Sequence, residues 1–216
     1  MNSFRGVFVT GTDTEIGKTL VSAILTKAWT ATYWKPLQTG LSEEAGDTST
    51  VKTLAALPPD RIIPPAYALQ APLAPYAAAA LENVTINPGR LVLPAVKAPL
   101  VVEGAGGLMV PVRSDMMMID LMQRLDLPVV LVARSGLGTI NHTLLSLEAL
   151  RRRGIPVLGV VLSGPENPGN ARDIAHFGNV RILFSVPRLE SINETVVSEI
   201  SGRVPPLCVL QQQNSQ

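Results

Sequence analysis

The stretch from Thr10 to Thr19, which reads TGTDTEIGKT, limits the fold of this 216-residue chain more than any other part of it. It directly follows an apolar run at residues 7–9, and a helical pattern follows it in turn. An apolar strand, a glycine-containing loop that ends in Gly-Lys-Thr and a helix form the context that a phosphate-binding loop requires. The pattern is a variant, because Gly11 lies one position before the first glycine of the usual motif and Thr12 takes its place. We nevertheless predict a phosphate site here, because the amides and the dipole at a helix start favour negative charge.

The remaining apolar runs predict a parallel sheet. Short Val- and Leu-rich runs lie at residues 7–10, 32–35, 100–103, 129–134, 157–163 and 181–186, and the clearest helical patterns lie at 18–29, 47–57, 115–125 and 141–153. Strands that are apolar on both faces and separated by helices are typical of a sheet covered on both sides. We therefore predict an α/β protein with the three-layer P-loop NTPase-like fold, with a mostly parallel sheet and helices on both faces, as one domain over residues 1–216.

Two segments depart from this alternation. Residues 58–99 are rich in proline and contain an alanine tract at 77–80, so we expect short helices and loops that cross one edge of the sheet. The polar tail at residues 211–216 has nothing to bury and is expected to fray.

Composition excludes several classes of function. Charged residues make up 16% of the chain and the net charge is +1, so nucleic acid is not expected as a partner. The basic run at residues 151–153 ends a helical pattern, where cations suit the helix dipole. The apolar runs are the length of strands, which predicts no membrane span, and no signal peptide is evident, so we expect a cytoplasmic protein. The single Cys208 is expected to act as a small apolar residue.

Charged side chains follow the apolar strands at their carboxyl ends. Glu103 ends one strand and Lys35 follows another. Because ligands collect at this edge of an open parallel sheet, both side chains are expected to face the phosphate loop. Glu103 offers Mg²⁺ a hard oxygen ligand, and Lys35 can stabilise charge on a transferred phosphoryl group. Asp47 begins a helical pattern, so it could cap that helix, contact a metal, or do both.

Taken together, these motifs resemble the dethiobiotin synthetase family. The resemblance rests on GTDTEIGKT at residues 11–19, KPLQTG at 35–40, Asp47, VEGAGG at 102–107, LGTINHT at 137–143 and the turn at 186–189, which span nearly the whole chain in order. It implies ATP-dependent carboxylation and ring closure of 7,8-diaminopelargonate (7,8-diaminononanoate) with CO₂ or bicarbonate. A carbamate and a carbamic-phosphoric anhydride would precede dethiobiotin, ADP and phosphate.

The resemblance also implies roles for particular residues. Lys35 and Lys18 match the catalytic lysines of the family. The nucleotide would contact Glu15, Ile16, Gly17, Lys18, Thr19, Leu20, Glu103, Gly104, Ala105, Gly106, Ser163, Gly164, Pro187, Arg188, Leu189 and Glu194. The carbamate and diamine would contact Thr14, Lys35, Thr39, Gly138, Thr139, Ile140 and Asn141, and Mg²⁺ would be held by Thr19, Asp47 and Glu103. In this family two subunits pair so that the substrate's far carboxylate is held by the neighbour, which implies a homodimer. His142 and His176 receive no catalytic role.

One departure from the family pattern concerns the base of the nucleotide. Ser163 and Gly164 stand where many relatives have Asn-Asp, a pair implicated in reading adenine. A hydroxyl and a glycine offer fewer groups to the base than an asparagine side chain does. We therefore expect other nucleoside triphosphates, CTP among them, to be accepted alongside ATP, with a preference for ATP below about tenfold.

Two alternatives share the predicted fold. A nucleotide-dependent dimerising switch ATPase of the partition type would carry a second lysine early in the loop, where this chain has Thr10 to Glu15. A catalytically inactive interaction module would not need Lys18, Lys35 and Glu103 together. A GTPase would need an Asn-Lys-x-Asp motif, and the sequence contains none.

Overall fold

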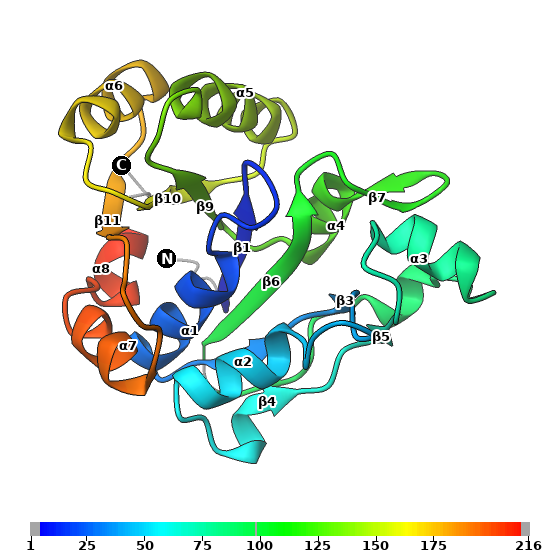
Figure 1. Cartoon of the computed structure of the whole chain (residues 1–216). Helices are drawn as coiled ribbons and strands as arrows, with labels where there is room; N and C mark the ends of the chain where they lie inside the picture. Colours follow the sequence, from blue (N-terminus) through cyan, green and yellow to red (C-terminus); the bar gives the residue numbers. More distant parts are fainter. Residues whose placement is uncertain (1–4, 98, 213–216) are drawn as a thin grey trace.

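A seven-stranded parallel sheet forms the centre of the molecule (Figure 1). The computed structural model describes residues 5–97 and 99–212. The strands lie in the order β11-β10-β9-β1-β6-β2-β4, and each neighbouring pair is parallel. Their bounds are β1 (Gly6–Gly11), β2 (Thr32–Trp34), β4 (Ile62–Ile63), β6 (Leu100–Gly107), β9 (Val129–Arg134), β10 (Val157–Ser163) and β11 (Ile182–Val186). The predicted three-layer α/β fold is confirmed.

Helices cover both faces of the sheet because its strands are apolar on both sides. The helices are α1 (Lys18–Ala28), α2 (Asp47–Leu54), α3 (Pro75–Leu81), α4 (Met118–Leu125), α5 (Thr139–Arg152), α6 (Pro168–Gly178), α7 (Glu194–Ser201) and α8 (Leu207–Gln212). In β1, Val7 and Val9 pack into the core that α1, α2, α7 and α8 share, while Phe8 packs into the core shared with α4, α5 and α6. This alternation follows from the two-residue period of a strand.

The proline-rich segment at residues 58–99 wraps one edge of the sheet with short elements. It contains the 3₁₀ turns η1 (Pro59–Arg61) and η2 (Pro88–Arg90), helix α3, and strand β5 (Tyr67–Ala68), which pairs with β3 (Leu37–Gln38). The short helices were predicted, and the edge strand β4 was not.

Several boundaries differ from the sequence-based predictions. The helix expected at 115–125 begins at Met118, because the preceding residues form a hairpin of β7 (Pro111–Arg113) and β8 (Met116–Met117). The Asp120 carboxylate fixes this start by accepting a hydrogen bond from the Met117 amide at 2.7 Å. Helix α2 ends three residues earlier than expected, and α5 begins two residues earlier.

Three helices were missed, namely α6, α7 and α8. His176 therefore lies in a helix and not in an irregular region, and Cys208 is exposed on α8 where an apolar packing role was expected. Of the tail that was expected to fray, residues 211–212 belong to α8 and residues 213–216 lie outside the described part of the chain.

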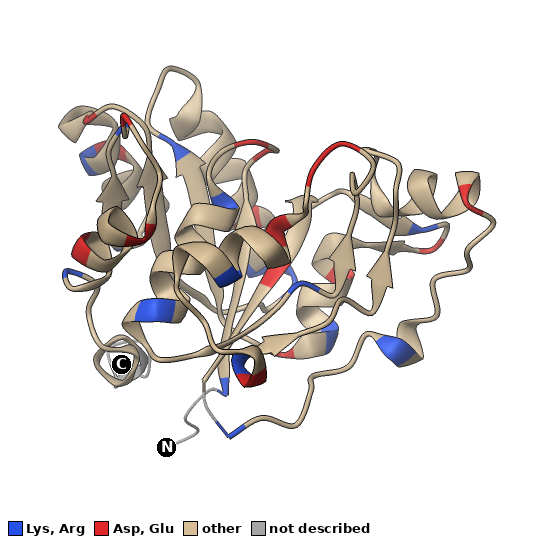
Figure 2. Ribbon diagram, turned by 60° about the horizontal axis from the view of Figure 1, so that its bottom comes forward, with Lys and Arg blue, Asp and Glu red and all other residues tan. Residues whose placement is uncertain are grey.

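Charges are distributed over many elements. Figure 2 shows Lys and Arg interspersed with Asp and Glu along the ribbon. At the end of α5, Arg151 donates a hydrogen bond to the Asn179 carbonyl at 3.1 Å, which ties this helix to the end of α6. Within residues 5–97 and 99–212, no helix has both the length and the apolar character needed to cross a membrane.

Candidate active site

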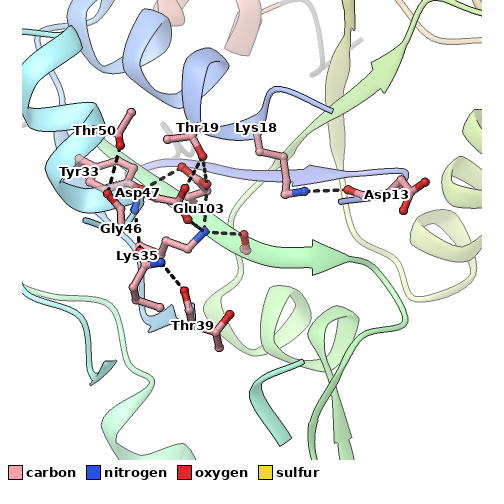
Figure 3. Close-up of polar contacts among 12 residues, drawn as sticks. Asp13, Lys18, Thr19, Tyr33, Lys35, Thr39, Gly46, Asp47, Thr50 and Glu103 are labelled. Atoms are coloured by element: carbon pink, nitrogen blue, oxygen red, sulfur yellow. Dashed lines mark hydrogen bonds and ion pairs between the residues drawn. The ribbon is translucent and has the colours of Figure 1, made fainter. Parts of the chain in front are cut away.

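Four polar side chains from separate elements meet at the carboxyl end of β2 and beside Glu103 of β6 (Figure 3). Glu103 was expected to end its strand, but β6 continues to Gly107. Lys35, which follows β2, lies with its Nζ 3.0 Å from Glu103 Oε1 and 2.5 Å from Asp47 Oδ2. The Thr19 hydroxyl at the start of α1 lies 2.7 Å from Asp47 Oδ1 and 3.0 Å from Glu103 Oε1. Lys35 and Glu103 are only 4% and 1% exposed, so this charged group is held inside the protein.

These oxygens suit a small divalent cation. The Thr19 hydroxyl has one proton and can donate it to only one of its two carboxylate neighbours at a time. A cation would satisfy the hydroxyl lone pair and both carboxylates together. Within the described residues no cluster of three or more His, Cys, Asp or Glu side chains is arranged to hold a metal ion. Two carboxylates and a hydroxyl nevertheless match Mg²⁺, which takes few protein ligands when substrate phosphates complete its shell.

Asp47 does not cap its helix. It is the first residue of α2, the cap position belongs to Gly46, and no side-chain capping bond is made there. The Asp47 amide instead donates a hydrogen bond to Gln38 Oε1 at 2.9 Å, and the Asp47 carboxylate faces Thr19 and Lys35. The capping interpretation is therefore wrong.

Burial lowers the pKa of both lysines, and the neighbouring carboxylates raise it. Burial tends to lower the pKa of Lys35, but Glu103 and Asp47 outweigh it and raise the pKa above its ordinary value. Burial and the charge of Lys35 lower the pKa of Lys18 to about 8, against the opposing effect of the nearby carboxylates. Lys35 is thus a fixed cation. Burial also acts to raise the pKa of Asp47, but the charge of Lys35 and hydrogen bonds from its neighbours hold it below the ordinary value.

Tyr33 holds the far side of Glu103. Its hydroxyl donates a hydrogen bond to Glu103 Oε2 at 2.8 Å, and both side chains are buried. Burial and the negative charges of Glu103 and Asp47 raise the pKa of Tyr33 well above its ordinary value. The hydroxyl therefore stays protonated and keeps one carboxylate oxygen of Glu103 occupied, which leaves the other for Lys35 and Thr19.

The phosphate loop connects β1 to α1 with two residues in left-handed conformations. Gly17, just before Lys18, has φ 91°, and a Cβ atom there would come within 2.8 Å of Ser163 Oγ, so glycine is required. Glu15 also has a positive φ of 52°. Lys18 Nζ donates a hydrogen bond to the carbonyl of Asp13 at 2.7 Å, within its own loop.

Two cavities meet at this loop. The first, of about 680 Å³, is lined by Asp13, Thr14, Glu15, Ile16, Gly17, Leu20, Arg134, Ser163, Gly164, Val186, Pro187, Arg188, Leu189 and Ile192. The second, of about 410 Å³, is lined by Thr14, Glu15, Gly17, Lys18, Thr19, Leu20, Lys35, Thr39, Asp47, Thr50, Leu54, Glu103, Ala105, Gly106 and Ile192. Most of the residues expected around the nucleotide, the metal and the reacting groups line one or both of these cavities.

The remaining expected residues lie elsewhere. Gly104 touches the site through its carbonyl, 3.4 Å from Lys35 Nζ. Glu194 lies at the start of α7 and pairs with Lys27 at 3.4 Å, and it is not among the lining residues of either cavity. The segment Gly138, Thr139, Ile140 and Asn141 forms the start of α5 and lines neither cavity.

Sequence reasoning missed Tyr33, Gln38 and Arg134. A tyrosine in a buried strand needs a partner for its hydroxyl, which is a signal that could have indicated Tyr33. Gln38 lies in the KPLQTG motif, and its side chain bonds both to the Asp47 amide and to the Thr39 carbonyl. Arg134 is the last residue of β9, so the rule that ligands gather at the carboxyl ends of strands applied to it as well.

Comparison with known proteins places these features in a family. The profile of a family described as "AAA domain" matches residues 5–196. The chain is 62% identical over 211 residues to the biotin biosynthesis bifunctional protein BioCD of Bordetella avium (strain 197N), a match that covers 98% of this chain and 45% of that protein. It is 55% identical over 202 residues to the ATP-dependent dethiobiotin synthetase BioD of Paramagnetospirillum magneticum, covering 94% of this chain and 96% of that protein.

Another relative and one solved structure agree with the fold and the family. The ATP-dependent dethiobiotin synthetase BioD of Agrobacterium fabrum is 51% identical over 184 residues, which are 85% of this chain and 86% of that protein. A ParA family ATPase from Chlorobium tepidum has a TM-score of 0.50 at 11% identity, covering 100% of this chain and 99% of that one, so it supports the fold alone. High identity over nearly the full length of curated synthetases, together with an intact phosphate-loop site, shows that the chain belongs to the ATP-dependent dethiobiotin synthetase family.

Proposed function

We propose that this chain uses ATP to convert 7,8-diaminopelargonate and CO₂ or bicarbonate into dethiobiotin, ADP and phosphate. One amine nitrogen of the diamine bonds to the carbon of CO₂ and loses a proton, which gives a carbamate. A carbamate oxygen then attacks the γ-phosphorus and ADP leaves. The second amine attacks the carbonyl carbon of the resulting anhydride, phosphate leaves, and a cyclic urea closes.

The observation that carries this proposal is the meeting of two cavities at one phosphate loop. The 680 Å³ cavity runs from the loop toward the ends of β10 and β11, where a nucleoside would fit. The 410 Å³ cavity holds Lys18, Lys35 and Glu103 and is where the carbamate and diamine would fit. Two sites that share a loop suit a reaction in which a phosphoryl group moves from one ligand to the other.

The lysines would neutralise charge during this transfer. A carbamate oxygen is a poor nucleophile and the γ-phosphoryl group is crowded with negative charge, so alignment and charge neutralisation matter more than proton transfer. Lys35, a buried ammonium fixed by Glu103 and Asp47, would lie beside the transferred group. Lys18 would leave the Asp13 carbonyl and bridge the terminal phosphates.

Thr19, Asp47 and Glu103 would hold Mg²⁺ beside the phosphates. When bound, the ion would supply a Lewis acid that neutralises charge on the phosphoryl oxygens. Thr14 and Thr39, which line the second cavity, would orient the carbamate and the diamine.

The start of α5 would act in a second subunit. Gly138 precedes the helix in a left-handed conformation with φ 88°, and Leu137 and Gly138 are exposed. Free amides at a helix start form a carboxylate site. Because this segment lines neither cavity of its own chain, we assign it to the far carboxylate of the diamine bound by the partner in a homodimer.

The test is phosphate release measured with diamine and bicarbonate supplied together and separately. Turnover is expected only when both are present with ATP and Mg²⁺. Equal phosphate release with ATP alone would favour a switch ATPase over the synthetase.

A further inference from the structure

Arg134 lines the proposed nucleotide cavity, and it has no role in the reaction proposed above. It ends strand β9, next to β1 in the sheet, and its Nη2 lies 2.7 Å from Asp13 Oδ2 in the phosphate loop. Both residues line the 680 Å³ cavity. The contact joins residues 121 positions apart in the chain, so it ties the loop to a strand outside its own strand-loop-helix unit.

Asp13 is the junction of three contacts. One carboxylate oxygen accepts a hydrogen bond from the Thr14 amide at 2.8 Å, and the other accepts from Arg134. The backbone carbonyl of the same residue accepts from Lys18 Nζ at 2.7 Å. A change in how Asp13 is held would therefore reach Lys18 directly.

The charge of Asp13 is a difficulty for an anion site. A carboxylate at the edge of a triphosphate cavity repels the ligand, and the Asp13 charge already contributes to the electrostatic environment of Lys18. Without another cation, the carboxylate could also pair with the Lys18 ammonium in place of the phosphates. Arg134 removes both effects, because its guanidinium occupies the carboxylate and neutralises it.

We propose that Arg134 is a positioning residue for nucleotide binding, which neutralises and holds the Asp13 carboxylate so that Lys18 is available to the phosphates. This inference rests on the proposed use of a nucleoside triphosphate at the same loop. It assigns Arg134 an effect on nucleotide affinity through Asp13, not a contact with the reacting atoms.

A double-mutant cycle tests the proposal. Arg134→Gln should weaken binding of a non-hydrolysable ATP analogue about tenfold, the effect expected of one unpaired carboxylate beside a triphosphate at the effective dielectric of a protein surface. KM for ATP should rise in parallel while kcat changes little. Asp13→Asn keeps an acceptor for the Thr14 amide but removes the charge, so it should weaken binding less than Arg134→Gln does.

The double variant decides the mechanism. Once Asp13 is neutral there is no charge left to compensate, so Asp13→Asn with Arg134→Gln should bind the analogue about as well as Asp13→Asn alone. Arg134→Lys should restore part of the affinity. A matched control is Arg152→Gln, which breaks an exposed ion pair with Glu148 on α5 and should leave nucleotide binding unchanged.

Three results would overturn the inference. If the losses added in the double variant, Arg134 would contact the nucleotide itself. If Arg134→Gln changed only Tm and left the affinity intact, its role would be structural. If Arg134→Gln changed nothing, the ion pair would be incidental. Failure of the wild-type enzyme to bind the analogue would instead contradict the proposed function.

Discussion

The positive charge of Lys35 balances two neighbouring carboxylates. Its ammonium lies between Glu103 and Asp47, and its removal leaves two carboxylates facing each other with no cation between them. Lys35→Ala should lower kcat by roughly 10²–10³, the usual effect of losing one group that stabilises a transition state. Tm should also fall, and Mg²⁺ should restore part of it by replacing the missing cation.

The control for this variant is Lys52→Ala, which removes an exposed lysine from α2. Steady-state kinetics and thermal unfolding with and without Mg²⁺ give both readouts. Near wild-type turnover in a folded Lys35→Ala enzyme would remove Lys35 from the mechanism.

Asp120 gives a prediction for stability against pH. The Met117 amide and then Arg153 hold the pKa of this carboxylate below its ordinary value, in spite of some burial. A lowered pKa means that the ionised form stabilises the fold. The contribution is complete above the ordinary aspartate pKa near 3.9 and is lost as the pH falls through the lower folded value.

Asp120→Asn keeps an acceptor for the Met117 amide but removes the charge, so it should reduce the free energy of unfolding by about 0.3–1 kcal/mol at pH 7, the usual contribution of an acidic side chain at a helix start. The difference from wild type should shrink as the pH falls through the folded pKa of Asp120. Urea unfolding at several pH values measures this, with Asp126→Asn at the other end of α4 as the control. A loss that stayed constant down to that pH would show that the charge of Asp120 is not involved.

At the scale of elements, sequence reasoning succeeded where the pattern was strong. The strands β1, β6, β9 and β10 are short apolar runs between helices, and a parallel sheet is the arrangement that buries both of their faces. Helix α6 was missed because its sequence contains two glycines and only Ile174 and Gly178 are buried, so its apolar period is weak. Helix α7 carries a signal that was not used, since Asn193 caps it by accepting from the Val196 amide at 3.1 Å.

The candidate site could be predicted where the order of strands and helices determines which residues meet. The rule that parallel strands end at one edge brought Glu103 and Lys35 to the site, although β6 continues beyond Glu103 to Gly107, and that rule needs only the order of elements. The partners of Asp47 and Asp13 depended on contacts across 28 and 121 positions of the chain, which no local pattern encodes. The position of Glu194 against Lys27, outside both cavities, likewise follows from how α7 packs on α1.

The end of strand β10 carries the prediction on base selectivity. The Gly164 amide donates to the Val186 carbonyl at 2.9 Å, and the Ser163 carbonyl accepts from the Ser135 amide at 3.0 Å, so these backbone groups already have partners. Ser163 offers one side-chain hydroxyl, and Gly164 has no side chain. We expect kcat/KM for ATP to exceed those for CTP and GTP by less than about tenfold, because few polar groups would be left unpaired by another base.

This is measured with the three nucleotides at identical Mg²⁺ concentration. Ser163→Asn is the informative variant, since its amide could present a donor and an acceptor together. A wild-type preference for ATP of about a hundredfold or more would contradict this account of Ser163 and Gly164.

The start of α5 carries the prediction on subunit exchange. Substitutions at Gly138 or Asn141 should weaken binding of the diamine and leave nucleotide binding nearly intact, because this segment lines neither cavity of its own chain. Mixed dimers of a Lys35→Ala subunit and a Gly138→Asp subunit should regain activity at one of their two sites. Absence of any recovery in verified heterodimers would place each complete site within one chain.

At the scale of the whole molecule, the sheet brings two cavities to one loop. The strand order puts β1 and its phosphate loop between β9, on the side of the nucleoside cavity, and β6, on the side of the lysine and carboxylate cluster (Figures 1 and 3). A nucleotide on one side and a diamine on the other would approach each other where the two cavities share Thr14, Glu15, Gly17, Leu20 and Ile192. The architecture therefore suits transfer of a phosphoryl group between two ligands better than simple hydrolysis.

The most direct measurement quantifies carbon incorporation and ATP consumption in the same reaction. The enzyme is incubated with 7,8-diaminopelargonate, ¹³C-bicarbonate, ATP and Mg²⁺, and mass spectrometry quantifies the products, with the Lys35→Ala enzyme in parallel. The account predicts dethiobiotin that carries the ¹³C in its ring, formed in equal amount with ADP and almost absent from the variant. ADP formed without labelled dethiobiotin would contradict it.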